Sequence, residues 1–229
     1  MSDRPESRAA RKTPKANGAE SVHAAGDRFE WLLGKAATLI ASKGFHHMSM
    51  RDVSRATGYS LAGLYHYVDS KETLLFEIQE RFFSTLVEEQ ARICAGDGPV
   101  EDRFRALMEN HLAFFAKHAD ELKVCTYELH SLAGEPFDRV AAIRKRYFRL
   151  MADVIKEIVG RGGGRAADLK VRHQTMFVFG ALNWIFMWYE EKRDGSPSRL
   201  AEQLSEFILH GLQGAKRDGA GVAKRKTRN

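Results

Sequence analysis

The stretch SMRDVSRATGYSLAGLYHYVDSKETL, residues 49–74, decides the fold of this chain. Ser49 and Asp52 stand three positions apart in a capping-box pattern, which predicts a short helix over 50–56. Gly58 then ends that helix, because glycine takes the positive φ of a tight turn without strain. Ser60 caps a second predicted helix that runs to position 67. Two short helices joined by such a turn have the dimensions of a helix-turn-helix.

Longer helices flank this motif on both sides. Apolar residues at helical spacing predict a helix over 28–43, which Gly44 ends as a left-handed cap. Asp69 and Glu72 form a further capping-box pattern and predict a helix over 70–94. The motif therefore belongs to a three-helix unit.

Five more helical segments follow, separated by glycine and proline, and no strand-like alternation of useful length is found. They lie at 100–117, 120–131, 137–161, 166–192 and 198–212. We predict an all-α fold with two domains. Residues 26–70 form an N-terminal three-helix helix-turn-helix DNA-binding domain, and 71–213 form a larger helical ligand-binding and dimerisation domain. Residues 1–25 and 214–229 are expected to be disordered tails, the second of them basic.

The formal net charge of +6 comes from the two ends of the chain. Residues 1–25 contribute +2 and residues 214–229 contribute +5, which leaves −1 for the part between them. Net charge therefore indicates an attraction of the tails to DNA phosphates and does not identify a DNA-binding domain. The N-terminal residues lack the apolar segment of a signal peptide, so we expect a cytoplasmic protein. Cys94 and Cys125 form neither a CxxC pair nor a disulfide framework.

The residues that contact DNA are expected at the start of the second short helix, which in this motif meets base edges in the major groove. Its small, uncharged residues permit close approach but offer few bidentate donors. Tyr65 and Tyr67 either pack their rings or donate to phosphates, whereas Leu64 and Val68 are expected in the core. The predicted DNA-binding residues are Ser49, Arg51, Ser60, Leu61, Ala62, Gly63, Tyr65, His66, Tyr67 and Lys71.

From Ala36 to Leu75 the chain closely resembles the DNA-binding domain of the TetR family. The resemblance is carried by Gly44-Phe45, Ser49, Gly58, Leu64-Tyr65-His66-Tyr67, Ser70-Lys71-Glu72 and Leu74. It departs at Tyr59, Gly63 and Val68, where Val, Thr and Phe are usual, and Gly63 lacks a hydroxyl that contacts DNA in this family. The resemblance implies that Lys71 and the tyrosines contact phosphates, which agrees with the free N–H groups at a helix start.

The segment from Met176 to Tyr189 is apolar almost all round. It is too short to span a bilayer, which needs about 20 residues, so we expect no membrane partner. A helix that is apolar on every face is buried on every face. We therefore predict that one side packs within the subunit and the other against the partner in a homodimer. Asn183 within this segment either bonds across the dimer axis or borders a ligand cavity with Trp184.

TetR-family proteins pair their last two helices in a four-helix bundle, here 166–192 with 198–212. Leu182-Asn183-Trp184 followed by Trp188-Tyr189 resembles the branch of the family that senses acyl-CoA thioesters. This resemblance implies a long apolar pocket with arginines at its mouth, supplied by Arg139, Arg144, Arg146 and Arg149; a solvated charged face is the alternative for each. The predicted ligand-binding residues are His111, Phe115, Tyr127, Arg146, Asn183 and Trp184.

The sequence contains no paired nucleophile and base, no HExxH spacing and no phosphate loop after a strand, so neither an enzyme nor a cofactor is predicted. His111 and His118 lie on one helix face but lack a third ligand, so no metal site is predicted. The predicted function is a ligand-responsive transcriptional repressor. It binds palindromic double-stranded operator DNA as a dimer and is released by a small apolar effector, for which the resemblance implies an acyl-CoA thioester. The alternative is a ligand-independent architectural DNA-binding protein, against which the large apolar C-terminal domain argues.

Overall fold

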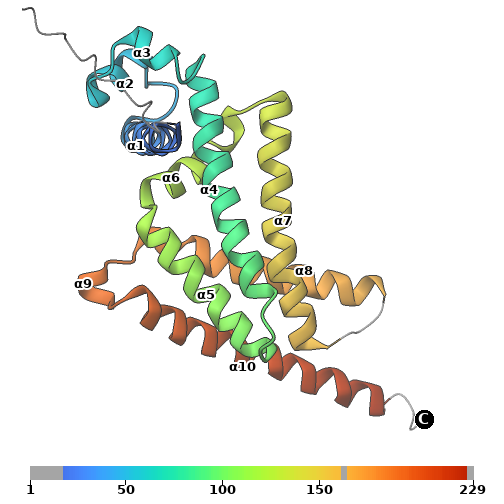
Figure 1. Cartoon of the computed structure of the whole chain (residues 1–229). Helices are drawn as coiled ribbons and strands as arrows, with labels where there is room; N and C mark the ends of the chain where they lie inside the picture. Colours follow the sequence, from blue (N-terminus) through green and yellow to red (C-terminus); the bar gives the residue numbers. More distant parts are fainter. Residues whose placement is uncertain (1–17, 161–163, 226–229) are drawn as a thin grey trace, which may run out of the picture.

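The computed structural model describes residues 18–160 and 164–225, with side chains described for 26–160, 164–185 and 187–212. Within these ranges the chain consists of helices and turns and contains no strand (Figure 1), which confirms the predicted all-α class. A small group of helices lies at one end of the molecule, and α4 leads from it into a larger bundle. None of the described helices is long and apolar enough to cross a membrane.

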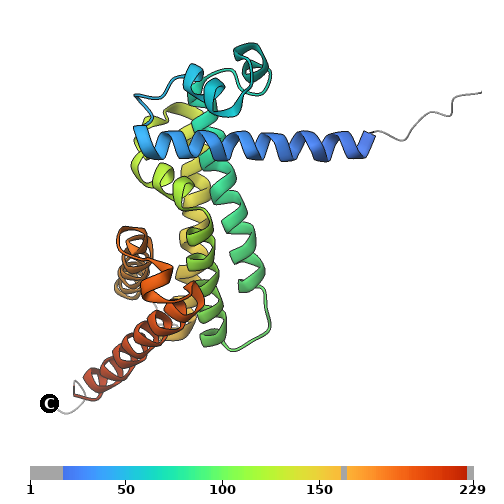
Figure 2. The same ribbon diagram turned by 90° about the vertical axis from the view of Figure 1, so that its left-hand side faces the viewer.

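The N-terminal group consists of α1 (Gly18–Lys43), α2 (Met50–Thr57) and α3 (Leu61–Tyr65). Figure 2 shows α1 as a long helix that lies across one end of the bundle. Helix α1 begins at Gly18 and so includes the last part of the segment 1–25 that was predicted to be a disordered tail. Residues 18–25 contain three alanines and no proline, so a helix nucleated by the buried turns that follow extends through them at low cost.

The caps of the short helices are those expected from the sequence. The Ser49 hydroxyl accepts the Asp52 N–H at 3.3 Å, and the Asp52 carboxylate accepts the Ser49 N–H at 2.9 Å, which completes the capping box. Gly58 has φ 72°, so the turn from α2 to α3 requires a residue that tolerates the left-handed region. Ser60 caps α3 by accepting the Gly63 N–H at 3.1 Å.

Helix α4 (Lys71–Cys94) has a different cap from the one expected. The hydroxyl of Ser70, rather than the side chain of Asp69, accepts a backbone N–H, that of Thr73 at 3.0 Å. Asp69 and Ser70 both offer a side-chain acceptor one position apart, so the spacing of residues alone does not choose between the two registers.

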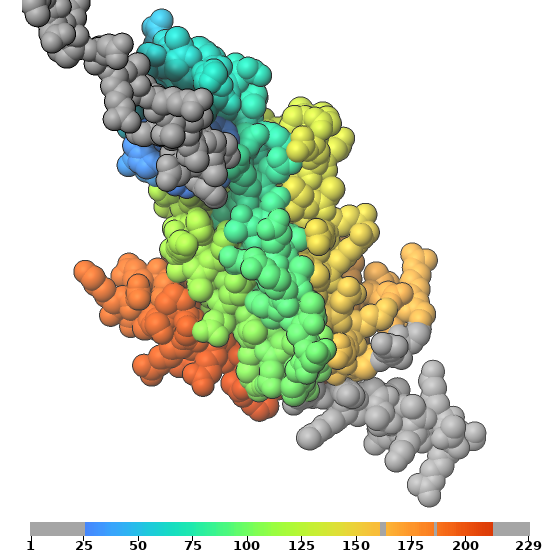
Figure 3. Space-filling model, viewed as in Figure 1, coloured from blue at the N-terminus to red at the C-terminus, as the bar shows by residue number. Residues whose placement is uncertain are grey.

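The larger domain adds α5 (Val100–Lys117), α6 (Ala119–Tyr127), α7 (Gly134–Val159), α8 (Arg165–Asn183) and α10 (Pro197–Arg225). Shorter turns join them: η1 (Leu129–Ser131), η2 (Ile185–Met187) and α9 (Glu191–Asp194). Helix α4 packs against α5 and α7, and Figure 3 shows α4 and α7 side by side along the molecule. Helix α6 packs against α1, whereas α8 and α10 lie at the end remote from α1 (Figure 1).

Two segments predicted as single helices are interrupted. The segment 120–131 is α6 followed by η1, and the segment 166–192 is α8, η2 and α9. In the second case nearly every position from Met176 to Tyr189 is apolar, so periodicity cannot locate the end of the helix. The turn after Asn183 brings Ile185 and Tyr189 to a cavity beside α5.

At the C-terminal end, α10 continues to Arg225, well beyond the predicted end at 212. The helix thus includes residues 214–225 of the segment that was predicted to be a disordered tail. No proline interrupts this stretch, and adding residues to an existing helix requires no new nucleation.

One hydrophobic core runs through both groups of helices. Leu64 and Val68 lie in this core, as predicted, and so does Phe45 in the link between α1 and α2. Gly44 before it has φ 81°, the left-handed cap that ends α1. The packed core is continuous from α1 through α4 to α7, so no solvent layer separates the two groups of helices.

Candidate nucleic-acid interface and ligand cavity

The start of α3 presents small side chains to solvent. Ser60 and Ala62 are exposed, and Leu61 and Gly63 are partly exposed. The Ser60 hydroxyl is already used by the cap, and a Cβ at Gly63 would lie 3.3 Å from it. Glycine at 63 therefore leaves the Ser60 cap free of steric crowding. The surface at the start of α3 allows a binding partner to approach closely, but it offers few side-chain hydrogen-bond donors.

The two tyrosines that follow have different environments. Tyr65 is 50% exposed, and its neighbour His66 is also exposed. The ring of Tyr67 stacks on Phe29 with centroids 5.9 Å apart and lies 5.8 Å from the ring of Tyr59. Of the alternatives weighed for these tyrosines, packing applies to the Tyr67 ring, while Tyr65 is free to meet a ligand. Tyr59 supplies part of this aromatic support.

Arg51 lies exposed near the start of α2, and no ion pair involves it in the described part of the chain. Asp52 beside it is held by Lys43 at 3.2 Å and Arg55 at 2.6 Å. Hydrogen bonds from Ser49, together with those from Lys43 and Arg55, keep the pKa of Asp52 well below its usual range. The only nearby carboxylate on α2 is therefore offset by two cations, which leaves the Arg51 guanidinium available for an anion.

Lys71 is the first residue of α4, where backbone N–H groups lack helical partners and favour an anion. Its ammonium donates to the Phe45 carbonyl at 3.4 Å and lies 4.5 Å from the centre of the Phe45 ring. These two contacts with Phe45, in the link between α1 and α2, hold the Lys71 side chain in position. Together with Arg51, Tyr65 and the start of α3, it forms a surface suited to a phosphate backbone.

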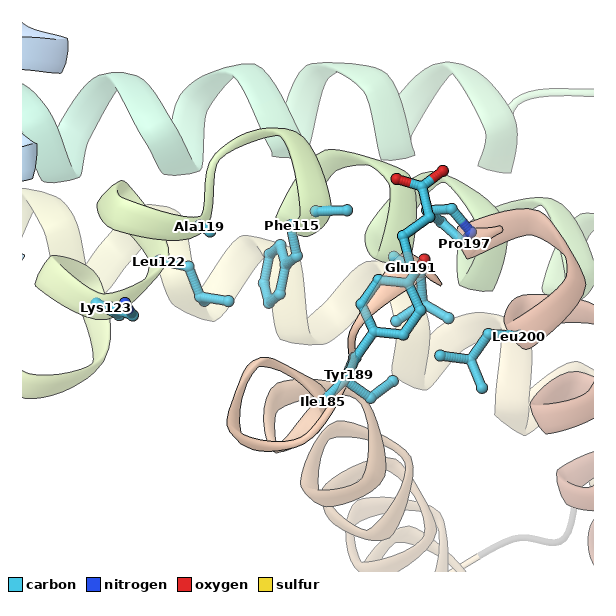
Figure 4. A pocket seen from close by; sticks show the side chains of 11 residues that line it. Phe115, Ala119, Leu122, Lys123, Ile185, Tyr189, Glu191, Pro197 and Leu200 are labelled. Atoms are coloured by element: carbon cyan, nitrogen blue, oxygen red, sulfur yellow. The ribbon is translucent and has the colours of Figure 1, made fainter. Parts of the chain in front are cut away.

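A cavity of about 300 Å³ opens between α5, α6 and the segment from η2 to α10 (Figure 4). Its wall is mostly apolar, with Lys123 from α6 and Glu191 from α9 as the charged lining residues. The ring of Tyr189 closes one side, and its hydroxyl donates to the Gly195 carbonyl at 2.8 Å. The lining residues are Leu112, Phe115, Ala116, Ala119, Leu122, Lys123, Ile185, Tyr189, Glu191, Pro197 and Leu200.

Behind Phe115 lies an aromatic cluster that contains one polar pair. The His111 ring is 3.8 Å from the Phe115 ring, and its Nδ1 is hydrogen-bonded to the hydroxyl of Tyr147, whose ring packs against Phe179. Burial lowers the pKa of His111 to about 3 and raises that of Tyr147, so both groups are neutral. No hydrogen-bond partner reaches His111 Nε2 within the described residues. A buried imidazole with one unused nitrogen lies next to the cavity wall.

The structure brings together only two of the predicted ligand-binding residues, Phe115 in the cavity wall and His111 behind it. Tyr127 is 63% exposed and donates to Met187 Sδ at 3.6 Å, away from the cavity lining. Asn183 and Trp184 are exposed at the end of α8 in the single subunit. They lie outside this cavity, but Trp184 lines a second groove with Trp188 and Phe207. Both alternatives for Asn183, a bond across a dimer axis and a place beside a ligand cavity, stay predictions.

None of the four arginines proposed for the pocket mouth lines this cavity. Arg139 pairs with Glu80 at 2.5 Å and with Glu135 at 3.5 Å. Arg144 is partly buried, lies 5.0 Å from the Phe83 ring and donates to the Cys125 carbonyl at 3.2 Å. Arg146 and Arg149 are exposed. The spacing of Arg139, Arg146 and Arg149 keeps these three on one side of α7, whereas Arg144 lies on a different face.

Sequence reasoning missed Lys123, Ile185 and Tyr189 in the wall and Tyr147 as the partner of His111. A buried histidine needs a hydrogen-bond partner. A tyrosine on the apolar face of another helix was therefore the one signal in the sequence that could have indicated Tyr147. His118, by contrast, lies 3.8 Å from Glu121, and its ring packs against Phe114. The described residues contain no group of three side chains that could hold a metal ion.

Comparison with known proteins agrees with this two-part layout. The family of bacterial regulatory proteins called tetR matches residues 32–78, which contain α2 and α3. The family described as tetracyclin repressor-like, C-terminal domain, matches residues 97–212, just over half of the chain. The two matched regions coincide with the helix-turn-helix and with the helices around the cavity.

Among curated proteins, the transcriptional repressor KstR2 of Rhodococcus jostii is 28% identical over 79% of this chain and 89% of that protein. A solved TetR-family regulator from Bordetella parapertussis has a TM-score of 0.74 at 26% identity, covering 80% of this chain and 94% of that one. AibR, solved in complex with isovaleryl coenzyme A and operator DNA, shares the fold with a TM-score of 0.65 at 23% identity, covering 80% and 96%. With its helix-turn-helix and its C-terminal domain both matched, this chain belongs to the TetR family of bacterial regulatory proteins.

Proposed function

We propose that this protein is a transcriptional repressor that binds palindromic operator DNA as a homodimer and is released by a small apolar effector, an acyl-CoA thioester. The observation that carries the proposal is the pairing of an exposed helix-turn-helix with a separate apolar cavity in the same chain. An architectural DNA-binding protein has no use for such a cavity.

DNA binding is supported by the surface around α3. The helix is short and presents Ser60, Leu61, Ala62 and Gly63 to the major groove, where they contact bases closely. Ser49, Arg51, Tyr65, His66, Tyr67 and Lys71 surround it as phosphate or base contacts. Donors for phosphates outnumber donors for base edges on this surface, so backbone contacts supply most of the affinity and its salt dependence.

Dimer formation is supported by the exposed apolar face of α8 and α10. Phe177 on α8 is 74% exposed and Phe207 on α10 is 78% exposed, and both line a shared surface groove. Large apolar side chains gathered on two adjacent helices mark an interaction surface. A two-fold axis through this face pairs α8 and α10 with their copies, covers Asn183 and Trp184, and places two α3 helices for half-sites ~34 Å apart.

The effector site is supported by the cavity and the cluster behind it. A volume of about 300 Å³ corresponds to roughly ten water molecules. It therefore accommodates the acyl group of a thioester, with the coenzyme outside. Displacement of the Phe115 ring would extend the site to His111, whose unused nitrogen can bond a carbonyl or hydroxyl of the effector. AibR, which shares the fold, was solved with an acyl-CoA of this kind.

Release follows from the position of α6 between the cavity and α1. Leu122 and Lys123 line the cavity, while Thr38 on α1 donates to Asp120 on α6 at 2.9 Å. An effector that fits only when α6 moves outward has different affinities for two arrangements of the domains, and so shifts the population from one to the other. The arrangement with α6 displaced changes the spacing of the α3 helices and loses the operator.

The proposal is tested by selecting duplexes from a random pool with the wild-type protein, and then titrating the complex with acyl-CoA esters while fluorescence anisotropy reports bound DNA. We expect a palindromic site and its release by short or medium acyl-CoA, with free coenzyme A as the negative control. Ala116 lines the cavity and Ala113 on the same helix does not, although both are exposed. Ala116→Leu should raise the acyl-CoA concentration needed for release, and Ala113→Leu should behave as wild type.

Different failures identify different errors. If no thioester releases the protein, the effector assignment is wrong and operator binding stands. If the protein binds all duplexes equally and no ligand alters binding, the architectural alternative is correct.

A further inference from the structure

Glu128 joins the two domains at the end of α6. Its Oε1 accepts the N–H of Phe45 at 3.0 Å, and its Oε2 accepts the Ser131 hydroxyl at 2.7 Å. Phe45 belongs to the link between α1 and α2, so this carboxylate of the larger domain bonds the backbone of the smaller one. Each carboxylate oxygen therefore has its own partner, and the bond to Phe45 does not involve Ser131.

The main chain of Glu128 is held as well. Its carbonyl accepts the side-chain amide of Gln79 at 3.2 Å, and Gln79 on α4 is fully buried. Glu128 therefore contacts α4, η1 and the α1–α2 link at once. A residue bound on both its main chain and its side chain has little freedom to follow a displaced neighbour.

Phe45 in turn holds Lys71. The same residue whose N–H is bound by Glu128 accepts the Lys71 ammonium on its carbonyl at 3.4 Å and offers its ring face 4.5 Å away. The bonds thus run from Glu128 through Phe45 to a partly exposed lysine at the start of α4. No residue in this chain of contacts except Lys71 belongs to the surface proposed to meet DNA.

We propose that Glu128 is a positioning residue for DNA binding: it holds Phe45 so that Lys71 is presented to a backbone phosphate. This inference rests on the proposed function, because it requires that Lys71 contacts DNA. It also supplies a route for release. Leu122 and Lys123 on the same helix line the cavity, and a hydrogen bond between a carboxylate and an amide weakens steeply once α6 shifts and its geometry is lost.

The experiment is a double-mutant cycle between Glu128→Ala and Lys71→Ala, measured as affinity for the operator duplex selected by the wild-type protein over a range of salt concentrations. We expect each single variant to weaken binding about tenfold. Each should also lower the slope of log affinity against log salt by about one phosphate contact per subunit, which is about two for the dimer on its palindrome. The double variant should be no weaker than either single, because both remove the same contact.

Two further variants separate positioning from general destabilisation. Glu128→Gln keeps an oxygen that can accept the Phe45 N–H, so it should restore the wild-type salt slope. Ser131→Ala removes a neighbour of Glu128 but leaves the bond to Phe45, so it should stay close to wild type. Hydrogen exchange of the DNA-free protein should be faster over residues 44–48 in Glu128→Ala than in wild type or Glu128→Gln.

The outcomes are distinguishable. A wild-type protein that enriches no duplex overturns the repressor proposal and this inference with it. Wild-type binding combined with additive losses, or with an unchanged salt slope in Glu128→Ala, overturns the role of Glu128 alone. Unchanged hydrogen exchange over residues 44–48 in Glu128→Ala also overturns the role of Glu128. The bond to Phe45 would then not protect the backbone amides of this segment.

Discussion

Replacing Tyr147 with phenylalanine should destabilise the protein by an amount set by one buried hydrogen bond. In the wild type the Tyr147 hydroxyl and His111 Nδ1 satisfy each other, and both side chains are buried. Removal of the hydroxyl leaves the imidazole with no partner on either nitrogen. Leaving a buried polar atom unpaired costs about 1–3 kcal/mol. For a chain of this size each 1 kcal/mol lowers the melting temperature by about 2–4 °C, so we expect a fall of roughly 2–12 °C.

The reverse change has a smaller expected cost. His111→Leu leaves the Tyr147 hydroxyl unpaired, but it also removes the Nε2 atom that has no partner in the wild type. The double variant His111→Leu/Tyr147→Phe contains neither group, so its unfolding free energy should return to the wild-type value or exceed it. This non-additivity identifies the pair as the source of the effect.

The assay is urea unfolding followed by tryptophan fluorescence, at one protein concentration because dimerisation contributes to stability. Tyr189→Phe is the matched control: it also removes a hydroxyl bonded to a single partner, but that residue is only partly buried. It should cost less than about 1 kcal/mol. Additive losses in the double variant, or a Tyr147→Phe effect within about 0.5 kcal/mol of zero, would refute the reasoning.

Further predictions concern the charge state, the dimer face and the DNA surface. Because burial lowers the His111 pKa from 6.5 to about 3, the unfolded state binds a proton below pH 6.5 that the folded state does not, so stability falls from pH 6.5 toward pH 4. Urea unfolding at several pH values should show this slope in wild type and its reduction in His111→Leu. Phe207→Glu places a charge on the exposed face of α10, and light scattering should detect a monomer where wild type is a dimer; a dimeric variant would contradict the proposed face. Ser49→Ala removes the α2 cap and should cost about 1 kcal/mol by the same unfolding assay. Arg51→Ala should lower the salt slope of operator binding by about one contact per subunit, or about two per dimer, without changing stability, and an unchanged slope would remove Arg51 from the interface.

Local patterns were sufficient to predict the helix-turn-helix. Ser49 with Asp52, Gly58 and Ser60 act within a few residues of themselves through caps and a left-handed turn, so their roles can be read from spacing. The same reasoning placed Gly44, and periodicity placed Leu64 and Val68 in the core. It failed where the local signal is ambiguous. Asp69 and Ser70 are equally good caps, and the uniformly apolar run after Met176 contains no pattern that marks the end of α8.

The sites of the larger domain depend on contacts between distant residues. His111 meets Tyr147 36 positions away, and Phe45 meets Glu128 83 positions away. Helical periodicity states which face of a helix is apolar but not which helix covers it, so neither pair can be deduced from spacing. For the same reason, the spacing of the four arginines on α7 did not reveal that none of them lines the cavity. By itself, then, the sequence determined an all-α chain with a capped DNA-binding motif, because caps and turns are local. Only the packing of α4, α5, α6 and α7 decided where the cavity lies and which side chains connect it to that motif.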